Sequence, residues 1–226
     1  MHLLIPAAGM GKRMGSNRNK ILLVLRSHPI IAWTILIASA SREISWIGIV
    51  SQPTDWDDIK TILASLNLEK PVELIAGGAT RQESVYNGLL ALPSNAQQVL
   101  IHDGARCLAT PDLFDRCAIA VRECPGLITA IPVKDTIKVV DESGIIQSTP
   151  DRKNLWAAQT PQGFDVKLLK ECHEMGIKLG WEVTDDAALF EKCGYNVKIV
   201  PGEETNLKIT TPQDLALAEF ILGMRE

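Results

Sequence analysis

The sequence of 226 residues lacks the patterns that mark a structural metal site. None of its five cysteines form a Cys-x-x-Cys pair, and its four histidines do not have the spacing of zinc ligands. A zinc finger and a zinc ribbon are therefore excluded. The cysteines are instead typical of reduced thiols in a cytoplasmic protein.

The sequence also lacks a long apolar run. No segment approaches the roughly 20 apolar residues of a membrane span, and Ile30 to Ala40 is short enough to predict a buried helix. The N-terminus has neither the apolar core nor the cleavage site of a signal peptide. We expect no membrane partner and a cytoplasmic location, or the plastid stroma if the chain is a mature organellar form.

An excess of positive charge is missing as well. The chain has 23 Lys and Arg against 27 Asp and Glu, for a net charge of −4. This balance argues against a general nucleic-acid binder, although it leaves room for a local cationic pocket. There is no linker composition, internal repeat or low-complexity segment, and the length suits one α/β domain. We therefore expect a single domain over residues 1–226.

What the sequence does contain is a regular alternation of short apolar runs and helical patterns. Such alternation predicts an α/β fold: a single Rossmann-like, mostly parallel sheet with helices on both faces. The predicted strands are Leu3–Ala7, Ile44–Ser51, Val72–Ala76, Val99–His102, Leu127–Val133 and Asn196–Val200. The predicted helices are Pro29–Ala40, Thr54–Leu66, Thr80–Leu92, Thr110–Glu123, Asp165–Lys178, Thr184–Cys193 and one from Pro212.

The alternation stops after Val133. Two β-prone segments, Lys134–Asp141 and Ile145–Thr149, flank a turn and predict a β-hairpin within a protruding arm at about 134–158. A charged stretch follows the hairpin. Because an isolated hairpin is only marginally stable in water, we expect this one to pack on another surface, such as a second subunit.

Three glycine-containing loops follow predicted strands. They are Ala7–Lys20, Gly77–Arg81 and Asp103–Arg106. Ligands of parallel α/β sheets bind at the carboxyl ends of the strands. The three loops are therefore expected to converge at one edge of the sheet.

The first of these loops has the chemistry of a phosphate site. Gly9 and Gly11 allow backbone amides to approach an anion closely, and Lys12, Arg13 and Lys20 can neutralise phosphate charge. The spacing does not match a Walker loop. It does not match the dinucleotide fingerprint either, since Gly15 comes one position late. A plain turn is the simpler alternative, and a dinucleotide oxidoreductase is a weak one.

Four other positions are considered as site residues, and each has a structural interpretation. Asp103 could bind Mg²⁺ or a sugar hydroxyl, or only pair with Arg106. His102 would point to the opposite face of a regular strand and is interpreted as structural. Thr184 and the two acids after it are explained by a helix N-terminus. Lys208 is by default a surface lysine.

Taken together, the motifs resemble those of a known family. The first is similar to the signature of sugar nucleotidyltransferases, and the set in this order resembles the 2-C-methyl-D-erythritol 4-phosphate cytidylyltransferases of the non-mevalonate isoprenoid pathway. The resemblance extends from Leu4 to the last helix. The motifs are Ala7-Ala8-Gly9-x-Gly11-x-Arg13-Met14 with Lys20, Gly77-Gly78-x-x-Arg81-x-x-Ser84-Val85, His102-Asp103-x-Ala105-Arg106, Lys134-Asp135-Thr136-Ile137-Lys138, Thr160-Pro161-Gln162, Thr184-Asp185-Asp186 and Lys208-Ile209-Thr210.

The resemblance implies a reaction and a role for each matched residue. CTP and 2-C-methyl-D-erythritol 4-phosphate would give the CDP-linked alcohol and pyrophosphate, with Mg²⁺ or another divalent cation, which Asp103 is expected to approach. Arg13 and Lys20 would stabilise the transition state. The nucleotide-binding residues would be Ala7, Ala8, Gly9, Gly11, Gly78, Arg81 and Ser84. The substrate-binding residues would be Asp103, Arg106, Thr136, Arg152, Thr160, Thr184 and Lys208.

By the same resemblance, the arm would make a homodimer with shared active sites, because Thr136 and Arg152 lie on it. The chain departs from the family at Asn19-Lys20-Ile21, where Pro-Lys-Gln is frequent. Since Asn19 gives up the fixed φ of proline, we expect the empty loop to be more mobile. Two alternatives stay open: a ribitol 5-phosphate cytidylyltransferase and a catalytically silent nucleotide-binding homologue.

Overall fold

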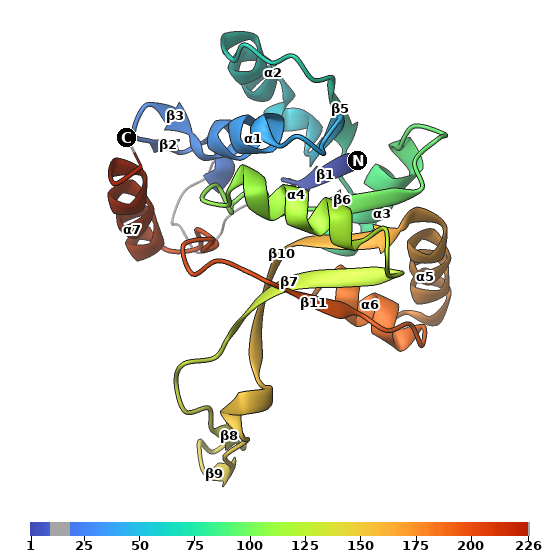
Figure 1. Cartoon of the computed structure of the whole chain (residues 1–226), viewed down its shortest axis with the longest axis vertical. Helices are drawn as coiled ribbons and strands as arrows, with labels where there is room; N and C mark the ends of the chain where they lie inside the picture. Colours follow the sequence, from blue (N-terminus) through green and yellow to red (C-terminus); the bar gives the residue numbers. More distant parts are fainter. Residues whose placement is uncertain (10–18, 226) are drawn as a thin grey trace.

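The fold is built on one central sheet. The computed structural model describes residues 1–9 and 19–225, and within them seven strands form a sheet in the order β11-β7-β10-β6-β1-β4-β5 (Figure 1). The strands are β1 (His2–Pro6), β4 (Trp46–Ser51), β5 (Val72–Ala76), β6 (Gln98–Ile101), β7 (Gly126–Pro132), β10 (Trp156–Asp165) and β11 (Lys198–Pro201). Two small hairpins pair β2 (Val24–Leu25) with β3 (His28–Pro29), and β8 (Val139–Val140) with β9 (Ile146–Ser148). The expected α/β, mostly parallel sheet is confirmed.

Strand β10 is the exception to the parallel arrangement and was not predicted. It pairs antiparallel with both β6 and β7, and its register to β7 shifts between Ala158 and Gln162. Pro161 and Gly163 are poor strand formers, so the local sequence hides this strand. Its two neighbours make it one, because they supply backbone partners on both sides.

The helices lie close to their predicted positions. They are α1 (Ile30–Ala40), α2 (Trp56–Ser65), α3 (Arg81–Ala91), α4 (Pro111–Ala120), α5 (Val166–Leu179), α6 (Asp186–Lys192) and α7 (Pro212–Gly223). Short 3₁₀ turns lie at η2 (Lys20–Leu22), η3 (Pro53–Asp55) and η4 (Arg152–Asn154). The predicted capping box of Thr80 and Glu83 is confirmed.

The expected N-cap of α6 is wrong by one residue. Asp185, not Thr184, has the extended backbone of an N-cap, and its side chain accepts a hydrogen bond from the amide of Ala188 at 2.9 Å. Aspartate caps a helix at least as well as threonine. The helix therefore begins one position later, and Thr184 is left exposed in the preceding loop.

Alternate residues of each central strand face two separate cores. In β1, Leu3 and Ile5 pack in a cluster with α1 and α4, whereas Leu4 packs on the other side with α3 and α5. A third cluster joins α7 to β2 and to the start of α1. With both faces covered, the carboxyl edge of the sheet stays open for a site.

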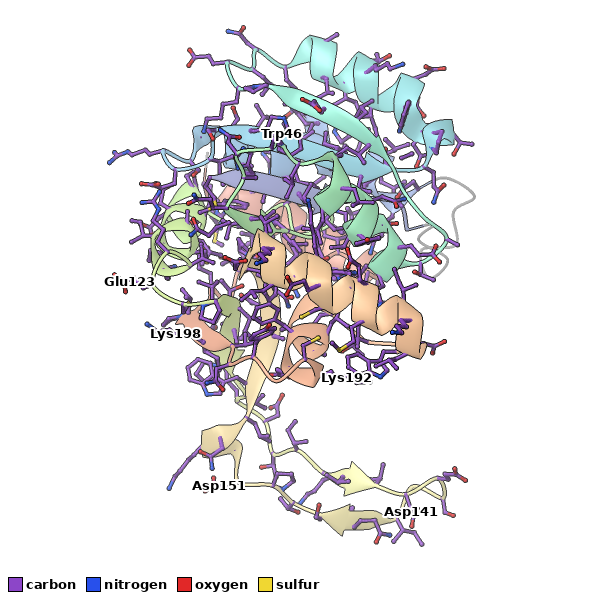
Figure 2. The ribbon with its side chains drawn as sticks, turned by 90° about the vertical axis from the view of Figure 1, so that its right-hand side faces the viewer. Trp46, Glu123, Asp141, Asp151, Lys192 and Lys198 are labelled. Atoms are coloured by element: carbon purple, nitrogen blue, oxygen red, sulfur yellow. The ribbon has the colours of Figure 1, made fainter. Side chains whose placement is uncertain are left out.

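The predicted hairpin is present but short. Instead of two long strands, only β8 and β9 pair, and β7 and β10 continue out of the body toward them (Figure 1). Asp141 and Asp151 lie on this arm, well separated from Trp46 in the body (Figure 2). Nearly every residue from 134 to 158 is exposed, so the arm has no core of its own. Among the described helices, none has the length and apolar character to cross a bilayer.

Candidate active site

A pocket of about 300 Å³ opens at the carboxyl edge of the sheet. Five described segments line it: the end of β1 with the residues that follow it, the turn at Lys20 and Ile21, the loop between β5 and α3 with the start of α3, the loop after β6, and the segment before α7. The described lining residues are Pro6, Ala7, Ala8, Gly9, Lys20, Ile21, Gly78, Ala79, Thr80, Arg81, Ser84, Asp103, Gly104, Ala105, Lys208 and Thr210. The predicted convergence of the three loops is therefore confirmed where they are described.

Nine of the residues singled out from sequence meet in this pocket. They are Ala7, Ala8, Gly9, Lys20, Gly78, Arg81, Ser84, Asp103 and Lys208. Gly11 and Arg13 lie outside the described residues, as does the rest of the stretch on which the expected loop mobility depends. The described lining contains three cationic side chains and one carboxylate, so the pocket suits a polyanionic ligand.

The loop at Gly78 is held by the start of α3. The Ser84 hydroxyl accepts a hydrogen bond from the Gly78 amide at 3.0 Å and donates one to the Thr80 carbonyl at 2.8 Å. A Cβ at Gly78 would lie 2.4 Å from the Cβ of Glu83. Only glycine therefore allows the loop to fold this closely over the helix N-terminus.

Arg81 is fixed between two carboxylates. Its Nη2 lies 2.8 Å from Asp186 Oδ2, and its Nε lies 3.7 Å from Asp103 Oδ1. Burial of Asp186 raises the pKa of that carboxyl, but the charges and hydrogen bonds of Arg81 and His173 together outweigh burial, and the net pKa is lowered. The guanidinium group is thus held at the pocket by an ionised, buried partner on α6.

Asp186 is a residue that the sequence reasoning missed. The two acids at the start of α6 were explained by the helix terminus alone. One signal was available, since a helix needs only one N-cap and Asp185 supplies it. The second acid is almost fully buried and pairs instead with a residue of α3.

Asp103 is the charge centre of the pocket. Lys208 Nζ lies 2.7 Å from its Oδ2, and the Nε of Arg106 lies 4.0 Å from the same oxygen. Burial raises the pKa of Asp103, but the charges of Arg81, Lys208 and Arg106, together with the Lys208 hydrogen bond, exceed that effect and lower the pKa to about 2. Lys208 is therefore more than the surface lysine of its default interpretation, and Arg106 is the weaker partner of Asp103.

Thr160 and His102 support Asp103 from behind. The Thr160 hydroxyl accepts a hydrogen bond from the Asp103 amide at 3.0 Å and lies 3.0 Å from His102 Nδ1. His102 Nε2 lies 3.0 Å from the Arg106 carbonyl. Burial of the ring lowers the His102 pKa to about 4. His102 is thus a neutral structural side chain, as expected, which fixes two residues of the site.

Lys20 reaches across the pocket to the segment before α7. Its Nζ donates a hydrogen bond to the Ile209 carbonyl at 2.7 Å, next in sequence to Lys208. Ile21, which follows it, is buried in the core beside α1. The lysine therefore projects from a well-anchored turn.

Five of the seven predicted substrate residues are absent from the described pocket lining. Arg106 and Thr160 contact Asp103 from outside it, whereas the other three lie elsewhere. Thr136 and Arg152 are exposed on the arm, where Arg152 donates to the Lys134 carbonyl at 2.7 Å. The arm points away from the body (Figure 1). Thr184 is exposed before α6.

Comparison with known proteins gives one consistent family. The family model described as IspD, 2-C-methyl-D-erythritol 4-phosphate cytidylyltransferase, matches residues 1–224. The enzyme of that name from Nostoc punctiforme is 77% identical over 225 residues, covering 100% of this chain and 99% of the relative. That from Microcystis aeruginosa is 70% identical over 225 residues, with 100% of both chains covered.

Solved structures agree with the sequence relatives. A crystal structure of 4-diphosphocytidyl-2C-methyl-D-erythritol synthase from Anaerococcus prevotii superposes with a TM-score of 0.87 at 34% identity, covering 98% of this chain and 97% of the other. The 2-C-methyl-D-erythritol 4-phosphate cytidylyltransferase from Thermus thermophilus gives a TM-score of 0.79 at 32% identity, covering 97% of each chain.

Proposed function

The chain belongs to the 2-C-methyl-D-erythritol 4-phosphate cytidylyltransferase family and joins CTP to 2-C-methyl-D-erythritol 4-phosphate, and from this premise we propose how its residues divide the work. The acceptor phosphate attacks the α-phosphorus of CTP in line and displaces pyrophosphate. No nucleophile of the protein is needed. The pocket therefore has to orient two anions and stabilise the charge that develops between them.

The first wall of the pocket holds CTP. The backbone of Ala7, Ala8 and Gly9 and the loop at Gly78 approach the nucleotide, since these positions present little or no side chain. Arg81, which two carboxylates keep in place, contributes a cation. Lys20 supplies positive charge at the reacting phosphate, and Arg13 and Gly11 complete the loop by sequence.

The second wall holds the acceptor. Lys208 and Arg106 offer positive charge to its phosphate, while Asp103 can accept hydrogen bonds from its hydroxyl groups. Thr160 keeps the Asp103 backbone in place. Thr184 completes this wall only if the loop before α6 approaches the ligand.

A divalent cation fits the pocket in a limited way. No cluster of three His, Cys, Asp or Glu side chains occurs among the described residues, and Asp103 is the only acidic residue in the described lining. No hydrogen bond from a described residue reaches its Oδ1, whose ion-pair partner Arg81 lies 3.7 Å away. Mg²⁺ is commonly held by one carboxylate, substrate phosphates and water. Asp103 would thus be the protein ligand of Mg²⁺, which neutralises phosphate charge when bound.

The arm completes the site in a homodimer. Thr136 and Arg152 lie on the exposed arm, which points away from the body, and neither lines their own chain's pocket. The arm also carries exposed apolar residues, among them Val140, Ile145 and Ile146. An arm that packs on a second copy would bury this surface and bring Arg152 to the other pocket.

One observation carries the assignment of roles. Lys20, Arg81, Asp103 and Lys208 are brought from four distant parts of the chain into one pocket, and Lys20 bonds to the carbonyl next to Lys208. The two lysines therefore flank the place where the two phosphates must meet.

The test separates the roles of the two lysines. We expect Lys20→Ala to lower kcat by about 100- to 1,000-fold and to change CTP affinity little, because Lys20 acts mainly in the transition state. Lys208→Ala should mainly raise the KM for the acceptor. Pyrophosphate release and CTP binding measure the two effects.

Lys167→Ala, on the exposed side of α5, is the matched control and should behave as wild type. A Lys20→Ala protein that changes only the KM for CTP would overturn the proposed role of Lys20. A Lys208→Ala protein with an unchanged acceptor KM would overturn the proposed second wall.

A further inference from the structure

Asn19 is a buried polar residue directly before Lys20 to which the proposed mechanism gives no task. The geometry points to a positioning role: Asn19 holds the nucleotide-binding backbone at Ala7 in register with Lys20, and Asp55 anchors it. The inference rests on the proposed role of Lys20. It adds a residue that need not touch either substrate.

The Asn19 amide joins three separate segments. Its Nδ2 donates to the Ala7 carbonyl at 2.7 Å and to Asp55 Oδ2 at 2.8 Å. Its Oδ1 accepts a hydrogen bond from the Ile21 amide at 3.3 Å. The side chain is 6% exposed. Only this orientation of the amide places donors against two acceptors and the acceptor against a donor.

The bond to Ala7 fixes a peptide plane of the pocket. The Ala7 amide donates to the Val50 carbonyl of β4 at 2.7 Å, and Asn19 holds its carbonyl from the other side of the residue. Because a trans peptide is planar, its N–H points opposite to its C=O. Asn19 therefore also sets the direction of the Ala8 amide, and Ala8 lines the pocket.

The bond to Ile21 fixes the turn that carries Lys20. Asn19 is the N-cap of η2, and its own carbonyl accepts from the Leu22 amide at 3.0 Å. Its backbone φ is −59°, so side-chain bonds keep it in the region that a proline ring would impose. Lys20 thus leaves a turn whose first residue is fixed on both sides.

Asp55 anchors the Asn19 side chain beside the end of β4. It lies at the end of η3, just after β4, and it offers Asn19 a charged acceptor, which makes a stronger hydrogen bond than a neutral one. One amide therefore ties the ends of β1 and β4 to the base of the lysine.

The first test removes the tie. We expect Asn19→Ala to lower kcat and CTP affinity together, with kcat/KM for CTP falling on the order of 100-fold, since small misplacements of catalytic groups have effects of this size. This pattern differs from that of Lys20→Ala, in which CTP affinity is retained. Asn19→Ser keeps one donor and one acceptor and serves if Asn19→Ala does not fold. It should lower kcat and CTP affinity together, by less than Asn19→Ala.

The second test exchanges donor and acceptor. Asn19→Asp removes both donors and places two carboxylates together, so it should be at least as inactive as Asn19→Ala. Asp55→Asn still accepts through its carbonyl oxygen and should lose only about threefold. The double variant restores a donor–acceptor pair between positions 19 and 55, but it leaves a carboxylate oxygen against the Ala7 carbonyl. It should therefore stay far below wild type, close to Asn19→Asp.

Ser41→Ala is the matched control for stability. Ser41 is also buried and also joins an Asp carboxylate to backbone groups, at Asp115 and Ile44, but it lies at the amino edge of the sheet. It should lower the melting temperature about as much as Asn19→Ala while leaving kcat and CTP affinity unchanged.

Two results would overturn the inference. One is a folded Asn19→Ala protein with wild-type kcat and CTP affinity, and the other is a double variant that regains wild-type kcat and CTP affinity without a donor at position 19. Failure of the proposed function looks different. If Lys20→Ala changes only the KM for CTP while Asn19→Ala still lowers kcat and CTP affinity together, the proposed role of Lys20 is wrong. The positioning role of Asn19 then stands.

Discussion

The pocket and the arm differ in what lies buried and what lies exposed. Around the pocket, charged groups such as Asp103 and Asp186 are buried and each lies beside a cation. On the arm, apolar residues such as Ile145 and Ile146 are more than half exposed. Buried charges need partners and exposed apolar surface needs cover. The pocket finds what it needs within one chain, whereas the arm does not.

This difference indicates where each region gets its rigidity. The pocket loops follow strands of the central sheet, and a hydrophobic core packs against each face of that sheet. The arm is joined to the body by β7 and β10 and by an exposed ion pair between Lys134 and Glu204. Substitutions around the pocket should therefore change the stability of the single chain. Substitutions on the arm should instead change its association with a second copy.

The largest effect is expected when the two regions are disabled in different chains. Arg152→Ala and Lys20→Ala should each be nearly inactive with both substrates at low concentration. After subunit exchange in a 1:1 mixture, about half of the dimers are hybrids with one intact site of two, so about a quarter of wild-type activity should return. Pyrophosphate release during mixing measures this.

A mixture that stays as inactive as its components would show that the arm does not act across subunits. Mixing Lys20→Ala with Lys208→Ala gives the matched control. Both changes lie in the body of the chain, so their hybrids leave no intact site and should show no rescue.

The next effect concerns acid stability, which should arise in the body rather than in the arm. His102 is fully buried, and burial lowers its pKa from 6.5 to about 4. Between these values the unfolded chain binds a proton that the folded chain does not. Stability is therefore lost as pH falls from about 6.5 to 4, by about 3 kcal/mol.

His102→Gln should remove this part of the pH dependence. We expect wild type to lose about 3 kcal/mol more unfolding free energy than the variant between pH 7 and pH 4, as measured by urea denaturation. A second loss follows at lower pH in both proteins. The pKa of Asp103 is lowered to about 2, so its stabilising charge is lost only as pH falls from about 4 toward 2. Equal slopes for the two proteins above pH 4 would contradict the role of His102.

The smallest effect comes from two lysine–carboxylate pairs that differ chiefly in exposure. Lys208 lies 2.7 Å from Asp103, whose side chain is 12% exposed, and Lys134 lies 2.5 Å from Glu204, whose side chain is 66% exposed. Water screens the arm pair, so Lys134→Ala should cost at most about 0.5 kcal/mol. Lys208→Ala should cost about 1–2 kcal/mol, because it leaves a buried carboxylate less well paired.

Denaturant unfolding at low protein concentration measures both lysine variants without a contribution from dimer formation. Equal costs for the two variants would mean that exposure does not separate the regions in the way that the structure indicates.

Much of the fold could be predicted because local signals agreed with the tertiary outcome. The capping box at Thr80 and the apolar runs of β1, β4 and β5 are examples. Strand β10 could not be predicted, since Pro161 and Gly163 oppose a strand locally and only pairing with β6 and β7 overrides them. The α6 N-cap was misplaced because Thr184 and Asp185 are both good caps.

The site could be predicted in part, for a different reason. The glycine loops and Lys20 carry a phosphate signal in their own sequence. Lys208 was found only through the resemblance, and Asp186 was not found, because their contacts with Asp103 and Arg81 each span 105 residues of the chain. No spacing rule reaches that far.

The sequence by itself determined the class of fold, the converging loops and the family, because each depends on motifs read in order along the chain. Only the tertiary structure decided which charges pair and how Asn19 joins three segments. The physical reason is distance. Ion pairs and hydrogen bonds act over a few ångströms in space, and only folding sets which residues come that close.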